Sequence, residues 1–232
     1  MRLFGKKLNI QALQNKYPAP ATSYPYYEIA SMVQGSDEWK NWRRRVVGAS
    51  DAPIIMFENR WTRPESLIEE KLGTAKEFAG NAATREGQQL EGTVRNLLQD
   101  KYGTRLKASV VQDGEVPYFA ASLDAIDDKH SSVYEIKCGA KAYSIVATTK
   151  SIPDYYRAQL QHILMITQLD KVIYAAYRPN SRLITVEVGR NESYIKRMRE
   201  AEELFAERLR RSGLVLQESF LGNRIERFNP QD

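Results

Sequence analysis

The chain has very little cysteine, and this scarcity excludes several kinds of site. Its 232 residues include a single cysteine, Cys138. One thiol cannot form an internal disulfide, and it cannot build a zinc or iron–sulfur site that needs several cysteines. A metal site in this chain would therefore depend on other ligands.

Long hydrophobic runs are missing as well. No apolar stretch approaches the roughly 20 residues that a membrane helix requires. The start of the chain carries lysine and glutamine where a signal peptide has its apolar core. We therefore expect a cytoplasmic protein that does not associate with membranes. The net charge of +5 is compatible with a polyanionic partner but is too small to identify one.

The order of the predicted elements indicates an α/β (α+β) fold, with a central mixed β-sheet flanked by helices. Helices are expected to start at Ser36, near Asp51 and at Pro64, where a capping hydroxyl, early acids or a first-turn proline favour a helix. A long amphipathic helix is expected over 84–102, with an apolar stripe of Leu90, Val94, Leu97 and Leu98. Strands are expected over about 104–112, 116–126, 132–138, 172–177 and 183–188, and further helices over about 153–169 and 191–211.

Residues 1–27 differ from the rest and predict an N-terminal extension with little regular structure. Pro18, Pro20 and Pro25 interrupt any helix there. The tyrosines at 24, 26 and 27 are candidates to anchor this segment on the body of the protein. Residues 28–232 are then expected to form a single domain.

The most informative feature is Asp124, which ten intervening residues separate from Glu135-Ile136-Lys137. Because side chains alternate along a strand, Glu135 and Lys137 share one face while Ile136 points into the core. Asp124 ends the preceding predicted strand, within reach of Glu135. Carboxylate oxygens at this density suit Mg²⁺ or Mn²⁺, and a nearby amine assists water attack on a phosphodiester. The feature points to a metal-dependent nuclease, although an ordinary solvated strand face explains a lone Glu-x-Lys equally well.

Three further segments bear on this interpretation. Glu91 lies at the edge of the apolar stripe of the long helix, and a surface acid is the alternative for it. Gln159 and Gln161 are two apart on a helix, so one can face a site while the other faces elsewhere. Arg43 and Ser50 follow two tryptophans expected in the core, and they are suited to bind a phosphate.

Five segments in this order resemble the lambda-exonuclease-like (YqaJ-type) viral recombinase nucleases, part of the wider PD-(D/E)xK nuclease fold. The resemblance covers about residues 34–190 and rests on these motifs: WKNWRRRVVGASDA, GQQLEGTVRNLLQDKYG, ASLDAI, YEIKC and YYRAQLQHILMITQLDKVIYAAY. One departure is Ala125, where the family commonly has glycine after the catalytic aspartate.

The resemblance implies roles for individual residues. Asp124 and Glu135 would bind metal together with the main-chain carbonyl of Ile136, and Glu91 would be the helix-borne acid of the same site. Lys137 would position or activate the attacking water. Gln161 would lie near the metal and the nucleophile. The 5′-phosphate of a DNA end would be bound by Arg43 and Ser50, with Ser122 near it. Arg43, Arg44 and Arg45 are consecutive, so the arginine that binds the terminal phosphate stays open.

The function implied is a Mg²⁺-dependent 5′→3′ exonuclease, with Mn²⁺ possible and two ions in the site, acting on double-stranded DNA ends. It would leave 3′ overhangs for phage-type recombination, as a ring-shaped homotrimer with a single-strand annealing protein as partner. The host setting would be a phage or prophage protein in a bacterium. Two alternatives remain: an endonuclease of the same fold, and a DNA-binding protein whose nuclease site is inactive.

Overall fold

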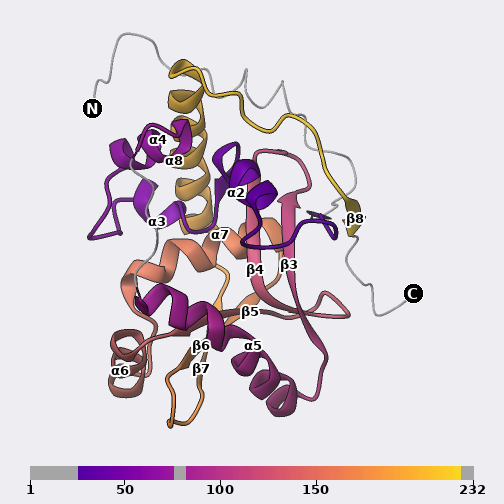
Figure 1. Cartoon of the computed structure of the whole chain (residues 1–232), viewed down its shortest axis with the longest axis vertical. Helices are drawn as coiled ribbons and strands as arrows, with labels where there is room; N and C mark the ends of the chain where they lie inside the picture. Colours follow the sequence, from indigo (N-terminus) through magenta and orange to yellow (C-terminus); the bar gives the residue numbers. More distant parts are fainter. Residues whose placement is uncertain (1–25, 76–81, 226–232) are drawn as a thin grey trace.

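The computed structural model describes residues 26–75 and 82–225, and a mixed sheet lies at its centre (Figure 1). The strands follow the order β7-β6-β5-β4-β3-β1-β8, and β2 pairs with β4 outside this path. The pairs β5–β6 and β2–β4 are parallel and the others are antiparallel, so the predicted mixed sheet is confirmed. The strands are β1 (Tyr26–Glu28), β2 (Val47–Gly48), β3 (Leu106–Asp113), β4 (Phe119–Asp127), β5 (Val133–Cys138), β6 (Lys171–Tyr177), β7 (Ile184–Gly189) and β8 (Asn223–Ile225).

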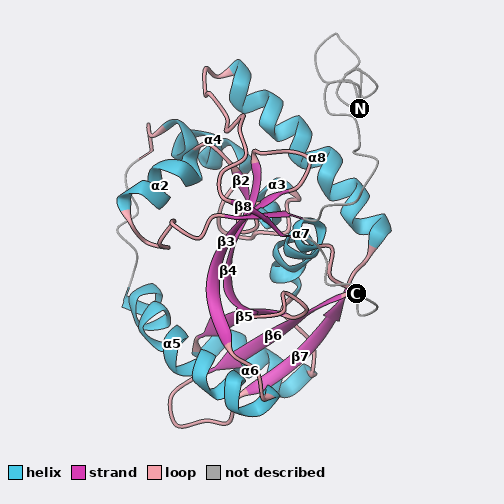
Figure 2. Cartoon of the chain, turned by 90° about the vertical axis from the view of Figure 1, so that its right-hand side faces the viewer, coloured by secondary structure: helices cyan, strands magenta, loops and turns pink. Residues whose placement is uncertain are grey.

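Helices cover both faces of this sheet, and Figure 2 shows α5 and α7 on opposite sides of β3 and β4. They are α2 (Asp37–Arg44), α3 (Ala52–Ile55), α4 (Pro64–Leu72), α5 (Ala82–Tyr102), α6 (Ala140–Thr149), the 3₁₀ turn η1 (Asp154–Tyr156), α7 (Arg157–Thr167) and α8 (Glu192–Arg211). None of the helices in the described ranges is both long and apolar enough to cross a membrane.

A short turn and a long crossover place β5 between two different neighbours. Asp127 closes the β4–β5 hairpin, because its carboxylate accepts hydrogen bonds from the backbone N–H groups of Ser131 and Ser132. Parallel strands cannot be joined by a tight turn. The chain therefore runs through α6, η1 and α7 before it returns as β6 beside β5.

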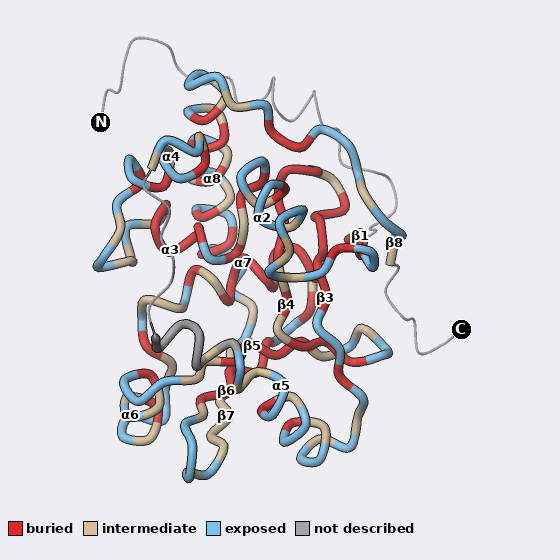
Figure 3. Tube along the Cα trace, viewed as in Figure 1, coloured by how far each residue is buried: buried red, intermediate tan, exposed pale blue. Residues whose placement is uncertain are grey.

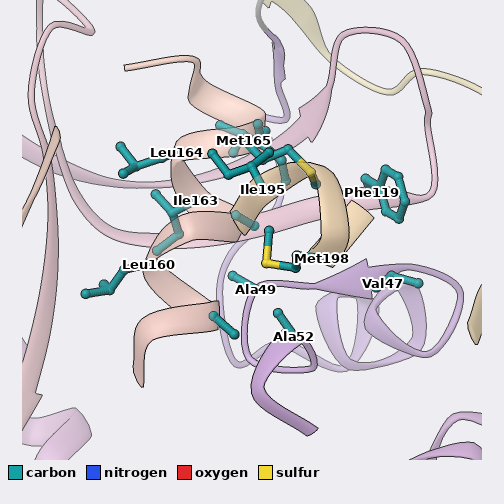
Figure 4. Close-up of a cluster of buried hydrophobic side chains, with 14 of the residues drawn as sticks. Val47, Ala49, Ala52, Phe119, Leu160, Ile163, Leu164, Met165, Ile195 and Met198 are labelled. Atoms are coloured by element: carbon teal, nitrogen blue, oxygen red, sulfur yellow. The ribbon is translucent and has the colours of Figure 1, made fainter. Parts of the chain in front are cut away.

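The larger core lies between the sheet and the α3, α7 and α8 layer. Leu160, Ile163 and Leu164 of α7 belong to this core together with Ile195 and Met198 of α8 (Figure 4). Figure 3 shows how completely α7 is buried. Since nearly every residue of α7 is enclosed, this helix has a fixed position on the sheet.

A smaller core on the other face joins α5 to the sheet. Val94 and Leu98 of α5 pack with Ala125, Tyr134 and Ile136. Strand alternation therefore sends Ile136 to this core, as predicted, and leaves Glu135 and Lys137 on the opposite face.

Several predicted details are corrected by the structure. Leu97 belongs to the predicted stripe but is 37% exposed, because it turns away from the sheet. The sequence did not lead us to expect helix α6, and the predicted helix over 153–169 begins as the separate turn η1. Tyr26 and Tyr27, placed in the predicted extension, form β1 with Glu28, whereas residues 1–25 lie outside the described ranges.

Candidate active site

The acidic centre consists of Asp124, Glu135, Lys137 and Glu91, and the β4–β5 hairpin supplies three of its members. The register that pairs Ala125 with Tyr134 sets Asp124 beside Glu135 on the neighbouring strand. Asp124 Oδ2 accepts a 2.8 Å hydrogen bond from the backbone N–H of Ile136. The predicted proximity of these carboxylates is therefore present in the fold.

Glu135 is the most enclosed acid of the centre, with 1% of its surface exposed. Its Oε1 accepts a hydrogen bond from Lys137 Nζ and a 2.6 Å hydrogen bond from Gln159 Nε2. Its Oε2 is buried and has no hydrogen-bond partner. Burial, together with the charge of Asp124, raises the pKa of Glu135 to about 7.

The other acids are shifted in the same direction. Burial raises the pKa of Asp124, and burial with the Asp124 charge raises the pKa of Glu91 to about 7. Arg95 Nε donates a 3.0 Å hydrogen bond to the backbone carbonyl of Asp124 and so ties α5 to β4 beside Glu91. Carboxyl groups buried close together resist ionisation, because their negative charges repel and are poorly solvated. A bound cation would offset this free-energy cost.

Lys137 shows the opposite behaviour. Burial alone would lower the pKa of Lys137, but the charges of Glu135 and Asp124 outweigh burial and raise it. Its Nζ also lies 5.0 Å from the centre of the Tyr156 ring. Lys137 is therefore held as an ammonium group that donates hydrogen bonds.

The donor set of the acidic centre suits a hard cation. Within residues 26–75 and 82–225, no three His, Cys, Asp or Glu side chains converge as a ready-made metal cage. Mg²⁺ does not need such a cage, because it is commonly held by one or two carboxylates and keeps several waters. The buried, unpartnered Oε2 of Glu135 is an acceptor that such an ion would satisfy.

The candidate anion site, called the anion site below, consists of Arg43, Ser50 and Ser122, and Trp39 connects its parts. One Arg43 nitrogen donates a 2.8 Å hydrogen bond to Ser50 Oγ, and the guanidinium carbon lies 4.8 Å from the centre of the Trp39 ring. Trp39 Nε1 in turn donates to Ser122 Oγ at 2.9 Å. Helix α2 begins at Ser36, whose side chain accepts the N–H of Trp39. Trp39 and Arg43 are four residues apart and so lie on the same face of this helix.

A buried ion pair holds the backbone that carries the anion site. Lys71 of α4 lies 2.5 Å from Asp51 Oδ2, and both side chains are 4% exposed. Lys71 Nζ also donates to the backbone carbonyls of Arg43, at 2.9 Å, and Val46, at 2.8 Å. Asp51 Oδ2 accepts the N–H of Gly48 at 2.8 Å. Lys71 thus joins the end of α2 to the turn that carries Ser50.

One pocket, with a volume of about 430 Å³, joins the acidic centre to the anion site. It is lined by residues of both sites: Arg43, Ser50, Glu91, Ser122, Asp124, Glu135 and Lys137. Of the three consecutive arginines, Arg43 lines this pocket, whereas Arg45 lines a separate groove beside Gln217. Arg43 therefore lies beside the acidic centre, and Arg45 does not.

The structure does not bring Gln161 to the pocket, which corrects the position implied by the family resemblance. Its side-chain amide donates to the carbonyl of Gly189 at 2.8 Å and accepts the N–H of Asn191 at 2.8 Å. Gln159 lines the pocket instead. Residues two apart lie on different faces of a helix, so only one of the two glutamines can reach Glu135.

Some supporting residues of the site were not predicted from the sequence. Lys71 stands among exposed charges in the sequence, and its burial depends on packing against a distant segment. Gln34 donates to the carbonyls of Ser109 and Leu123 and lines the pocket, although no motif marks it. Gln159 could have been identified, because its spacing from Gln161 shows that one of the two glutamines faces the site, but the spacing does not show which one.

Comparison with known proteins agrees with this architecture. A family model described as "YqaJ-like viral recombinase domain" matches residues 38–170, more than half of the chain. The uncharacterized protein YqaJ of Bacillus subtilis (strain 168) is 27% identical over 172 residues, which cover 72% of this chain and 54% of that protein. The chain thus spans about half the length of the curated relative it matches.

Two solved structures share the fold. An alkaline exonuclease (LHK-Exo) from Laribacter hongkongensis matches with a TM-score of 0.67 and 20% identity, covering 76% of this chain and 94% of that one. A phage related exonuclease from Haemophilus somnus 129PT matches with a TM-score of 0.54 and 16% identity, covering 72% and 96%. These likenesses agree with the expected fold, a central mixed sheet flanked by helices.

Proposed function

Because the chain belongs to the YqaJ-like viral recombinase family, we propose that it is a divalent-metal-dependent exonuclease that digests the 5′-ended strand of double-stranded DNA from its ends. The observation that carries this proposal is the single pocket that holds the acidic centre and the anion site together. An acidic centre alone would serve many nucleases. An arginine–serine pair beside it provides a place for a terminal phosphate.

The solved relatives support the proposal by their fold and their names. Both are exonucleases, and LHK-Exo has been solved in complex with dAMP. At 16–21% identity these likenesses concern the fold. The assignment of the reaction to this chain therefore depends on its own residues.

Asp124 and Glu135 would hold Mg²⁺ or Mn²⁺, two ions in all, with the Ile136 carbonyl and Glu91 as further oxygen ligands. When bound, the ions would supply Lewis-acid stabilisation of the phosphate and a more acidic water. Gln159 keeps Glu135 oriented through its 2.6 Å hydrogen bond. Lys137, held as an ammonium, donates to the attacking water or to the phosphate rather than removing a proton.

Arg43 and Ser50 select the substrate end. The guanidinium and hydroxyl already contact each other on the pocket wall, so little ordering is needed to receive a phosphate. Ser122 completes the site from β4. The products are mononucleotides and a duplex with a 3′ overhang.

The biological setting forms part of the same proposal. The chain works as a ring-shaped homotrimer around DNA, in the cytoplasm of a bacterial host, as a phage or prophage protein. A single-strand annealing protein takes over the 3′ overhang. Light scattering after size exclusion tests the trimer, and a mass of one or two chains contradicts it.

The decisive experiment uses linear duplexes with 5′-phosphate or 5′-hydroxyl ends and closed circular DNA, each with and without Mg²⁺. Strand-specific end labels report polarity. We expect Mg²⁺-dependent loss of the 5′-ended strand, faster with a 5′-phosphate, and intact circles. Efficient cutting of circles would establish an endonuclease instead.

Two variants separate chemistry from end selection. Lys137→Ala should abolish degradation, and unchanged degradation would favour an inactive nuclease fold. Arg43→Ala should remove the preference for 5′-phosphate while cleavage continues. Arg45→Ala is the matched control, because it removes the same charge from a side chain that lines a different groove.

A further inference from the structure

An aromatic ledge, made of Trp61, Tyr155 and Tyr156, lies next to the acidic centre and has no role in the reaction described above. Trp61 belongs to the segment between α3 and α4, whereas the two tyrosines belong to η1. Trp61 and Tyr155 meet edge to face, with ring centres 5.1 Å apart. The ring centres of Tyr155 and Tyr156 lie 4.6 Å apart. The ledge reaches Lys137, whose Nζ lies 5.0 Å from the Tyr156 ring centre.

The outer end of the ledge is open to solvent. Trp61 is 62% exposed, in contrast to Trp42, which is 6% exposed. An indole that is merely a core residue would bury its ring, since burial of apolar area is favourable. Trp61 is nevertheless held in place, because Tyr155 contacts it and Lys141 Nζ of α6 lies 5.3 Å from its ring centre. A fixed, exposed ring is prepared to stack against a flat partner.

Positive charge surrounds this exposed end. Lys141 is exposed, and so is Arg60, which lies close enough to Tyr155 to act on its pKa. A hydrophobic partner protein would not require two cations beside its anchoring ring. A polyanion with aromatic groups would use both the exposed ring and the cations. Single-stranded nucleic acid is such a partner, because it combines negative charge with unpaired flat bases.

We propose that the aromatic ledge binds unpaired nucleobases of DNA beside the cleavage centre, with Trp61 as the stacking residue and Lys141 contacting the backbone phosphate. This inference rests on the proposed function and deepens it by naming the form of DNA that touches the protein there. Inside a duplex each base is covered on both faces by its neighbours, so an aromatic side chain that stacks there needs a base that has left the helix.

Trp61 itself supplies the probe, because a stacked base quenches indole fluorescence. The whole 232-residue chain is titrated in EDTA with single-stranded oligothymidylate and with a blunt duplex made of two annealed strands. We expect single strands to quench a component of the fluorescence that the Trp61→Phe variant lacks. Trp61→Ala should weaken single-strand binding roughly 5- to 100-fold. Trp61→Phe, which keeps a flat ring, should retain most of the affinity.

Two comparisons decide the outcome. Phe220→Ala is the matched control, since Phe220 is an exposed aromatic, 39% exposed, that stacks on Tyr27 near the opposite end of the sheet. It should leave single-strand binding unchanged. The inference is overturned if Trp61→Ala binds single strands like the wild type, or if it weakens binding of the blunt duplex to the same degree.

The outcome is independent of catalysis because every titration is made without metal. Trp61-dependent binding by a protein without nuclease activity would support the ledge and sink the proposed exonuclease. A working exonuclease whose Trp61→Ala variant binds single strands normally would do the reverse.

Discussion

Gln159 donates its side-chain amide to Glu135 Oε1 across 2.6 Å, and the same oxygen contacts Lys137. The other oxygen of this buried carboxylate, Oε2, has no hydrogen-bond partner. Gln159 therefore fixes the orientation of Glu135 so that one oxygen is occupied and the other is available for the cation of the proposed function. Such supporting hydrogen bonds commonly set both metal affinity and ligand basicity.

Replacement of Gln159 should impair catalysis more than stability. We expect Gln159→Ala to lower Mg²⁺-dependent degradation roughly 10- to 100-fold, because Glu135 loses the group that orients it. The rate with a 5′-labelled duplex at increasing Mg²⁺ measures this effect. Part of the loss should be recovered at high Mg²⁺.

The matched control is Gln161→Ala, two residues further along α7. Gln161 bonds Gly189 and Asn191, so its loss should cost about 1–3 kcal/mol in the free energy of unfolding and leave the Mg²⁺ dependence unchanged. If the two variants exchanged these effects, the orientation of α7 described above would be incorrect.

Replacement of Lys71 should disturb the anion site through the backbone of Arg43. Lys71→Met leaves the Asp51 carboxylate buried without its partner, which should cost about 3–5 kcal/mol in the free energy of unfolding. It also removes the hydrogen bond to the Arg43 carbonyl. Since small misplacements of binding groups are costly, we expect the preference for 5′-phosphate ends to fall roughly tenfold.

The double variant Lys71→Met, Asp51→Asn separates the two consequences. It removes the unpaired charge, so denaturant unfolding should show most of the stability restored. The preference for 5′-phosphate should remain low, because the backbone hydrogen bonds are still missing. Recovery of both properties together would mean that Lys71 acts only on stability.

The β4–β5 hairpin was predictable because its determinants are local. Strand alternation places Glu135 and Lys137 on one face, and the short turn after Asp127 returns the chain beside Asp124. Strands β1 and β8 were missed, since each is three residues long and β1 pairs with β3, far along the chain. Helix α6 was missed because it is rich in Thr, Ser and β-branched residues, which have modest helix propensity.

The spacing of Gln159 and Gln161 could not show which of the two faces the acidic centre. The predicted helix over 153–169 assumed continuous α-helical phase, but the chain first makes the 3₁₀ turn η1. A 3₁₀ turn uses about 3.0 residues instead of 3.6, and it changes which side of the following helix meets the sheet. Gln159 therefore reaches Glu135, and Gln161 is left against β7.

Two adjacent leucines of α5 test the packing of the smaller core. Leu98 is fully buried between α5 and the sheet, whereas Leu97 is 37% exposed. Leu98→Ala should lower the free energy of unfolding by about 2–5 kcal/mol, because a cavity remains. Leu97→Ala should change it by less than about 1 kcal/mol. Urea denaturation measures both, and equal losses would contradict the observed phase of α5.

The pKa values of the two histidines of the chain are shifted in opposite directions. His162 is fully buried, with one ring nitrogen 2.7 Å from Glu202 Oε1 and the other 3.0 Å from the carbonyl of Ala120. Two acceptors require two N–H donors, which only the imidazolium has. Although burial opposes it, the charge of Glu202 raises the pKa of His162 above its ordinary 6.5. Burial lowers the pKa of His130, with the Glu28 charge working against that change.

The two histidines therefore contribute to stability in opposite pH ranges. Because the pKa of His162 is raised in the folded state, its stabilisation is complete below about pH 6.5 and is lost as the pH rises through the folded pKa. The loss amounts to about 1.4 kcal/mol for each pH unit that separates the folded and unfolded pKa values. The contribution of His130 is present above about pH 6.5 and is lost as the pH falls through its lowered pKa. An NMR titration of the imidazole signals measures both, with His130→Gln assigning the pair. A His162 signal that titrates below 6.5 would show a neutral ring and would contradict this expectation.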